Sequence, residues 1–196
     1  MNKLEISGVR NEFVKYLSKH TSLSEQDIQV IAESNIIKFF KKGTFLLRAG
    51  DFSNECFLIF KGCVRSFLVK EGEEKTIEFY TEEQPVSPVN FGKKIPSEYY
   101  LECIEDTIAC VSIPENEMFQ EYPQLESACR IMAETMMTMY QTSFTDYRTS
   151  SAEERYLSLL KDRPGLIQRV PQYQLASYLG IKPESLSRIR RRLNKK

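Results

Sequence analysis

Several residue types and motifs are scarce or absent in this chain of 196 residues, and each absence narrows its chemistry. With a single histidine, His20, and no CxxC pair, the chain lacks the ligands that a metal or haem site normally needs. No GxSxG motif, phosphate-binding loop or nucleophile–base pair is present, which argues against an enzyme. No apolar run approaches the roughly 20 residues that span a bilayer, so we expect no membrane contact.

The N-terminal segment and the cysteines indicate a reducing compartment. Residues 1–13 lack the apolar core of a signal peptide, so we expect the protein in the cytoplasm. An odd number of cysteines without an export signal argues against a disulfide framework. We expect buried thiols that pack as small apolar side chains, with a redox-sensing role as the alternative. The five are Cys56, Cys63, Cys103, Cys110 and Cys129.

Net charge is also absent, but the charges are unevenly distributed. Lys and Arg number 27, as do Asp and Glu. From Thr149 onward, however, eleven basic residues face four acidic ones, so this segment carries +7 and the remainder −7. A positive module joined to a negative body is expected where one end of a protein meets phosphates.

Residues 171–193 within this basic segment predict two short helices that meet at a tight turn. Gly180 can adopt the left-handed conformation that ends a helix. The small Ala176 before it, and apolar Leu186 and Ile189 six and nine residues beyond it, fit a helix-turn-helix. The alternative is an ordinary helical hairpin with a solvated basic face. Three consecutive arginines at 190–192 favour DNA contact instead.

In the rest of the chain, the spacing of the apolar residues changes twice, from helical to strand-like and back to helical. The first forty residues are helical in pattern, and residues 36–113 form short β-rich runs between glycines, as in an antiparallel sandwich or barrel. A long amphipathic helix follows over residues 122–147. One small barrel would not cover so many turns, so we expect a parallel homodimer along this helix; the alternative is a core helix packed on its own barrel. The expected interface residues are Leu125, Ala128, Met132, Met136 and Met139.

A hinge and a second helical unit are expected after the long helix. Ser151 and Glu154 have the spacing of a capping box, and the small polar run at 149–151 is the expected hinge. Leu166 to Val170 is expected to form one short strand of a wing. The expected domains are a sensor at 1–121, a dimerisation helix at 122–148 and a DNA-binding domain at 149–196.

Two segments carry a resemblance to a known family. KKGTFLLRAGDFSNECFLIFKGCVRSFLV is similar to the opening strands of a cyclic-nucleotide-binding barrel, and LASYLGIKPESLSRIRRRL is similar to a reading helix. Together with the order of elements, they resemble the Crp/Fnr family of bacterial transcription regulators. The resemblance implies an α+β fold with an antiparallel jelly-roll β-barrel sensor, a long dimerisation helix and a C-terminal winged helix-turn-helix. It also implies a homodimer that reads palindromic double-stranded DNA, with RNA polymerase as a candidate partner.

The resemblance assigns roles to residues of the second helix. Glu184, Ser185 and Arg188 take the places that read base edges, and their chemistry agrees, since Arg can donate two bonds to guanine and Glu can accept one from cytosine. We expect the remaining cations to hold phosphates, which positions the helix without specifying sequence, or to cover the edges of the core. These are Lys182, Arg190, Arg191 and Arg192.

The sensor departs from the members of the family that bind cyclic AMP. Residues 81–113 contain neither the Gly-Glu pair nor the arginine of the phosphate-binding cassette, and Lys93 and Lys94 are the only local cations. A buried cyclic phosphate needs a cation or a helix N-terminus to offset its desolvation, so we expect an unidentified small-molecule effector rather than cyclic AMP; the alternative is a regulator without an effector. The alternative function is a ligand- or redox-sensing barrel whose C-terminal helices are only structural.

Overall fold

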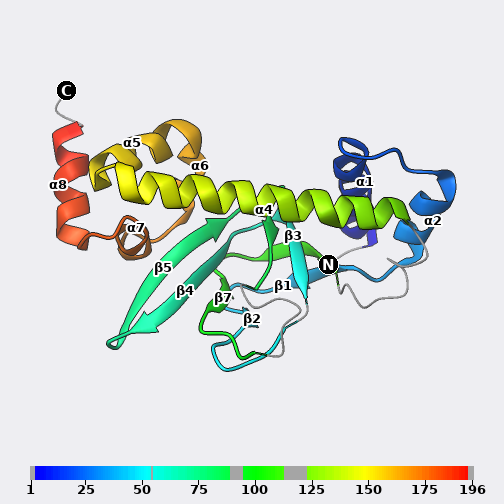
Figure 1. The fold of residues 1–196 in the computed structure, drawn as a ribbon, viewed down its shortest axis with the longest axis horizontal. Helices are drawn as coiled ribbons and strands as arrows, with labels where there is room; N and C mark the ends of the chain where they lie inside the picture. The colour runs from blue at the N-terminus through cyan, green and yellow to red at the C-terminus, as the bar shows by residue number, and fades with distance from the viewer. Residues whose placement is uncertain (1–2, 54, 89–94, 113–122, 194–196) are drawn as a thin grey trace.

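The computed structural model describes residues 3–53, 55–88, 95–112 and 123–193 (Figure 1). The side chains of residues 3–7, 112, 123–126, 128 and 129 are not part of this description. Within it, the strands are β1 (Ile37–Phe40), β2 (Phe45–Leu47), β3 (Cys56–Lys61), β4 (Val64–Lys70), β5 (Glu73–Tyr80), β6 (Pro85–Val86), β7 (Tyr100–Cys103) and β8 (Thr107–Ser112). The helices are α1 (Lys3–Ser18), α2 (Glu25–Glu33), α4 (Pro123–Thr149), α5 (Ala152–Asp162), α6 (Pro164–Arg169), α7 (Gln172–Tyr178) and α8 (Pro183–Leu193).

The strands form two antiparallel sheets, with the orders β1-β8-β3-β6 and β2-β7-β4-β5. Their facing side chains form an apolar core that includes Ile59, Val64 and Leu101. Alternating side chains explain this arrangement, because every second residue of a strand points to the same face of its sheet. The antiparallel sandwich or barrel expected over residues 36–113 is thus confirmed as two antiparallel sheets. We call these two sheets, residues 37–112, the barrel.

Helix α4 runs lengthwise past the barrel, with α1 and α2 near one end and α5–α8 near the other (Figure 1). Its 27 residues extend for roughly 40 Å at the usual rise per residue. One stripe of the helix packs on the chain's own body. Met132 lies against the core formed by α1, α2 and the first sheet, and Met139 lies against the core of the barrel.

Helices α5–α8, residues 152–193, form a compact unit that we call the head. Its first helix begins as expected, because the Ser151 hydroxyl accepts from the Glu154 amide while the Glu154 carboxylate accepts from the Ser151 amide. The expected wing strand at 166–170 is wrong, since Pro164 opens helix α6 there. Leu166 and Val170, four residues apart, are both buried in the core of the head.

The head packs on the edge of the barrel. Among the described residues, strand β5 is the last strand of its sheet, and none of the other described strands pairs with the outer side of its main chain. Ser177 of α7 occupies this side, because its hydroxyl donates to the Glu74 carbonyl (2.9 Å) and accepts from the Thr76 amide (3.0 Å). A side chain of the head therefore takes the place of a neighbouring strand.

The turn between β3 and β4 lies very close to the start of β8 at Gly62. Gly62 has φ +105°, and a Cβ there would lie 2.6 Å from the Thr107 hydroxyl oxygen and 2.7 Å from the Asp106 carbonyl oxygen. We expect Gly62→Ala to lower the free energy of unfolding by about 2–5 kcal/mol, since it combines backbone strain with overpacking. Gly43→Ala is the matched control: φ is +82° but nothing lies within 4 Å, so only the strain remains. Equal losses in urea denaturation would show that the close approach is harmless.

Candidate nucleic-acid interface

Helices α7 and α8 form the predicted helix-turn-helix. Gly180 has φ +70°, and the Ile181 amide donates to the Ala176 carbonyl (3.0 Å), which closes the end of α7. Ala176 is completely buried, as are the leucines on either side of the turn, Leu179 and Leu186. The small residue and the glycine thus have the roles that the sequence pattern assigned to them.

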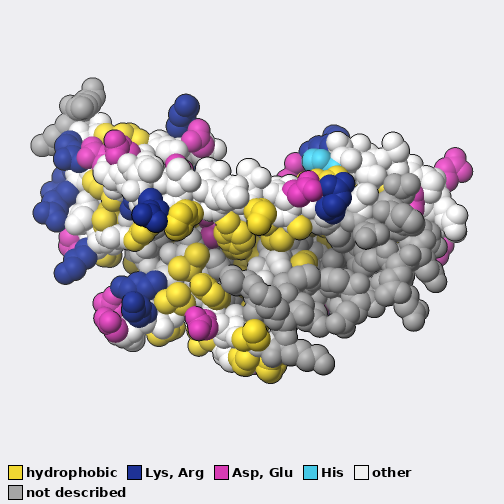
Figure 2. Space-filling model, in the orientation of Figure 1, with side chains coloured by type: hydrophobic (Ala, Val, Ile, Leu, Met, Phe, Trp, Pro, Cys, Tyr) yellow, Lys and Arg dark blue, Asp and Glu magenta, His cyan; other side chains and the backbone are white. Residues whose placement is uncertain are grey.

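Helix α8 has one buried and one exposed face. Leu186 and Ile189 are buried in the head, whereas Ser185 is half-buried at the edge of the exposed face. The other predicted DNA-contacting residues are exposed: Lys182, Glu184, Arg188, Arg191 and Arg192. Figure 2 shows Lys and Arg side chains gathered over this end of the molecule. All six residues therefore lie at accessible positions on α8 or directly before it.

The cations of α8 differ in what they contact. The Arg188 guanidinium donates to the Ser185 hydroxyl (3.1 Å), which holds the two side chains of the first turns together. Arg190 donates to the Tyr156 hydroxyl (3.0 Å) and lies over its ring, so this arginine braces α8 against α5. Arg192 pairs with Glu153 at the surface. Arg190 therefore binds within the head, whereas Arg188 is exposed and, among the described residues, binds only Ser185 of the same helix.

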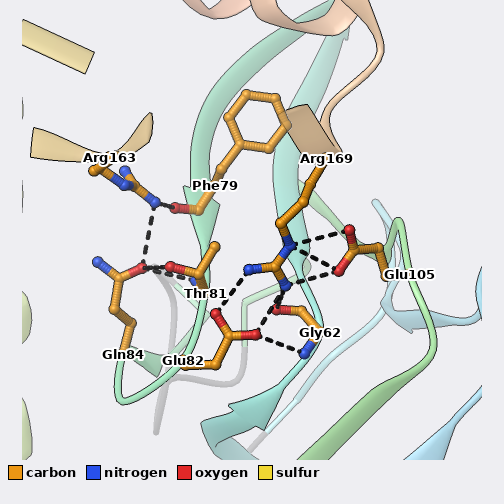
Figure 3. Close-up of polar contacts among 8 residues, drawn as sticks. All are labelled: Gly62, Phe79, Thr81, Glu82, Gln84, Glu105, Arg163 and Arg169. Carbon is orange, nitrogen blue, oxygen red and sulfur yellow. Dashed lines mark hydrogen bonds and ion pairs between the residues drawn. The ribbon is translucent and has the colours of Figure 1, made fainter. Parts of the chain in front are cut away.

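A second group of arginines joins the head to the barrel (Figure 3). Arg169 of α6 donates to both carboxylate oxygens of Glu82 (2.8 Å each) and of Glu105 (3.1 and 2.7 Å), and to the Gly62 carbonyl (2.7 Å). Arg163, between α5 and α6, donates to the Phe79 carbonyl (2.6 Å). Such charge-assisted bonds, several of them paired, are the strong kind.

The carboxylate of Glu78 connects three parts of the molecule. It is only 4% exposed, and it accepts from Arg163 of the head (3.1 Å) and from Ser143 of α4 (2.9 Å). The Tyr178 hydroxyl of α7 lies 3.4 Å from the same carboxylate. Burial, and then the charge of Glu78, raise the pKa of Tyr178 above its ordinary value, so this tyrosine stays a neutral donor.

Both the sequence and the fold of this chain are similar to those of known proteins. Residues 37–124 match the family of cyclic nucleotide-binding domains. FixK2 from Bradyrhizobium japonicum aligns with a TM-score of 0.67 at 16% identity, covering 81% of this chain and 84% of its own. A transcriptional regulator of the Crp/Fnr family from Eubacterium rectale gives 0.65 at 17% identity, covering 88% and 84%. The c-di-GMP responsive regulator CLP of Xanthomonas campestris gives 0.61 at 13%, covering 93% and 90%. A search of curated protein sequences finds no match.

The chain shares the fold of this Crp/Fnr-family structure from Eubacterium rectale. The resemblance noted in the sequence is thereby confirmed at the level of architecture: a cyclic nucleotide-binding domain, a long helix and a C-terminal helix-turn-helix. None of the helices in the described residues is long and apolar enough to cross a membrane.

The long helix α4 carries two apolar stripes, and the first of them is the dimer interface predicted from the sequence. Met132, Met136 and Met139 are half-buried, and the first and last pack on the chain's own cores. The side chains of Leu125 and Ala128 lie outside the described residues. The second stripe is exposed, with its members alternately four and three residues apart in the heptad pattern. It consists of Ala133, Met137, Tyr140, Phe144 and Tyr147, and we call it the outer stripe.

The arginines of the barrel contact other side chains of the same domain. Residues 37–124 contain two arginines, of which Arg48 is exposed and lies over the Phe45 ring. Arg65 is buried, but its guanidinium pairs with Glu74 (2.7 Å) and Glu102 (2.8 Å). Lys93 and Lys94 lie outside the described residues. Both arginines therefore have contacts within the barrel itself.

Three of the four cysteines whose side chains the structure describes are buried, as expected of packing residues, and the fourth, Cys56, is half-buried. Cys63, Cys103 and Cys110 are buried. Burial raises the pKa of Cys63 to about 12 and that of Cys103 to about 11, so both thiols are protonated near neutral pH. A protonated thiol is a poor nucleophile, which makes these two cysteines unsuited to redox sensing.

The ion pairs between head and barrel predict an acid-sensitive contribution to stability. Partial burial acts to raise the pKa of Glu82, but bonds from Arg169 and the Gly62 amide outweigh it and leave that pKa below its ordinary value. The pairing therefore stabilises the fold above the unfolded-state pKa of about 4.3, and this contribution is lost as pH falls through the lower folded-state pKa. We expect Glu82→Gln to lower the free energy of unfolding near neutral pH, with the difference from wild type vanishing in acid.

The control for this prediction is the same substitution in an Arg169→Gln background. With its partner removed, Glu82→Gln should no longer change the pH dependence of unfolding, measured by urea denaturation between about pH 3 and 7. A difference that persists in this background would assign the low pKa of Glu82 to some other contact.

Proposed function

We propose that this chain is a homodimeric, sequence-specific DNA-binding transcription regulator. The observation that carries the proposal is the exposed face of α8, which presents Glu184, Ser185 and Arg188 while its opposite face is buried in the head. The second helix of a helix-turn-helix enters the major groove with its N-terminal residues against base edges. These three residues occupy the first two turns of α8, where that geometry needs them.

The chemistry of this face supports base reading. Arg188 can donate two bonds to guanine O6 and N7, and Glu184 can accept from cytosine N4. The bond from Arg188 to Ser185 limits the freedom of the guanidinium before DNA arrives. Lys182, Arg191 and Arg192 flank the reading residues and supply phosphate contacts. Arg192 would exchange its partner Glu153 for a phosphate, since both offer oxygens to the same guanidinium.

The dimer forms, in this proposal, through the outer stripe. Met137, Phe144 and Tyr147 are each between 62% and 64% exposed, which is unusual for large apolar side chains in a regular heptad pattern. A second copy of α4, parallel and related by a two-fold axis, would cover them. The two heads would then face a palindromic site on double-stranded DNA. The proposed interface is therefore the outer stripe, and not the neighbouring stripe of Met132, Met136 and Met139 that was predicted from the sequence.

The sensor, in this proposal, responds to a small molecule other than cyclic AMP or has no effector. Its two arginines are committed or exposed, so a buried cyclic phosphate would lack a cation. We retain the domain limits 1–121, 122–148 and 149–196, with RNA polymerase as candidate partner on DNA and the cytoplasm as location. The alternative, a ligand- or redox-sensing barrel with a structural tail, predicts no effect of α8 substitutions on any activity.

Arg188→Ala tests the reading face. We expect enrichment of a palindrome from a randomised duplex library without added nucleotide. Arg188→Ala should weaken binding to that palindrome by about 1–3 kcal/mol per half-site and relax the preference at one base pair. Lys15→Ala removes an exposed cation from α1, at the other end of the molecule, and should leave binding unchanged. A loss that is equal on specific and random DNA would assign Arg188 to the phosphates instead.

Phe144→Glu tests the outer stripe. A charge in the centre of a buried seam lacks a partner, so the variant should sediment as a monomer where the wild type sediments as a dimer. Because Phe144 is 62% exposed within one chain, the variant should keep its helical circular dichroism. Thr145→Glu adds the same charge one residue away, on an exposed position off the stripe, and should remain dimeric. If Phe144→Glu remains a dimer, the outer stripe is not the interface, and the stripe of Met132, Met136 and Met139 becomes the candidate.

A further inference from the structure

The head is bound to its own barrel by contacts that a freely hinged DNA-binding unit would not need. We propose that Arg163 and Arg169 form a latch that fixes the head on the barrel and thereby sets the spacing between the two DNA half-sites that the dimer accepts. The inference rests on the proposed function, since spacing has meaning only for a dimer that reads DNA. Arg163 and Arg169 are positioning residues, because neither lies on α8.

Arg169 is the larger half of the latch. Its guanidinium joins α6 to three separate turns of the barrel, which carry Gly62, Glu82 and Glu105 (Figure 3). The Gly62 amide also donates to Glu82 (3.1 Å), which orients the carboxylate that receives the arginine. Rotation of the head about the 149–151 segment would break these bonds together, so they oppose it as one unit.

Arg163 is the other half of the latch, and it binds a main-chain carbonyl of the barrel. Its guanidinium donates to the Phe79 carbonyl and lies 3.1 Å from Glu78 and 3.4 Å from the Gln84 side-chain oxygen. A carbonyl in a strand has little freedom to follow a moving head. Glu78 also accepts from Ser143 of α4, so one buried carboxylate links the latch to the helix that carries the proposed dimer seam.

The segment expected to be a hinge is itself cross-braced. Arg155 of α5 donates to the Ser150 carbonyl (2.6 Å) and to the Leu179 carbonyl at the turn of the helix-turn-helix (2.6 Å). Its guanidinium also lies over the ring of Tyr147, a member of the outer stripe. The turn before α8 is thus connected to the proposed seam through a single side chain.

The latched arrangement leaves the reading face open. The exposed residues of α8 lie at the end of the molecule away from the barrel, and the latch residues lie on α6 and between α5 and α6 (Figure 1). Two latched heads in a two-fold dimer therefore have one fixed separation. A dimer of this kind selects one spacer length before any effector binds.

The test is a selection on duplexes in which two copies of the enriched half-site are separated by spacers of varied length. The wild-type protein should retain one spacer length, and Arg169→Gln should retain several. Its affinity for the preferred palindrome should fall by roughly tenfold or more, because a loosely held second head has a lower effective concentration at its half-site. Affinity for a duplex with a single half-site should stay within about threefold of wild type. Lys161→Gln, which removes an exposed cation from α5, is the matched control and should select as the wild type does.

The possible results separate the two proposals. If the wild type enriches no palindrome, the proposed function is wrong and the latch has nothing to position. If it enriches one but Arg169→Gln keeps the same single spacer, the latch inference is wrong and the proposed function stands. Glu105→Gln, which leaves the Arg169–Glu82 pair in place, covers the case in which Arg169→Gln does not fold, and it should broaden the selection to a smaller extent.

Discussion

The apolar cluster shared by the head and the barrel is the constraint on which the arrangement of the whole molecule depends. Phe79, Cys63 and Ile104 of the barrel lie in the same buried cluster as the leucines of the helix-turn-helix. Fully burying a side chain such as Phe79 contributes about 1.5–3 kcal/mol, so separating the head would cost several such contributions at once. The ion pairs of Arg169 are partly exposed, so water weakens the attraction between their charges, whereas Arg163 pairs with the buried carboxylate of Glu78.

The segregation of charge has two uses within one chain. The surplus of cations after residue 149 indicated a phosphate-binding surface, and α8 does expose Arg188 and Arg191. Arg163 and Arg169, counted in the same surplus, are instead neutralised by carboxylates of the acidic barrel. Opposite net charges on the two units therefore also favour their docking on each other.

How much the sequence could predict depended on whether a feature is local. The turn at Gly180 and the cap at Ser151 follow from residues a few positions apart, and both were predicted correctly. The wing was not, because five mixed residues fit a strand or a helix equally well, and Pro164 together with the pocket that receives Leu166 decided for the helix. The partners of Arg169 lie 64 to 107 residues away in sequence, so only the folded arrangement reveals them.

The long helix shows the same limit in another form. Its two apolar stripes are adjacent, and periodicity alone does not tell which one the barrel covers; burial of Met139 settles that question.

The hydroxyl of Ser177 has a consequence for the behaviour of the protein at high concentration. An uncovered edge strand is a template for pairing with the strand of another molecule, and natural proteins protect such edges. On β5 the side chain that covers the edge, Ser177, belongs to the head. The solubility of the sheet therefore depends on the head staying docked. A truncated chain that ends after α4 would expose the Glu74 carbonyl and the Thr76 amide, and with them a site for aggregation.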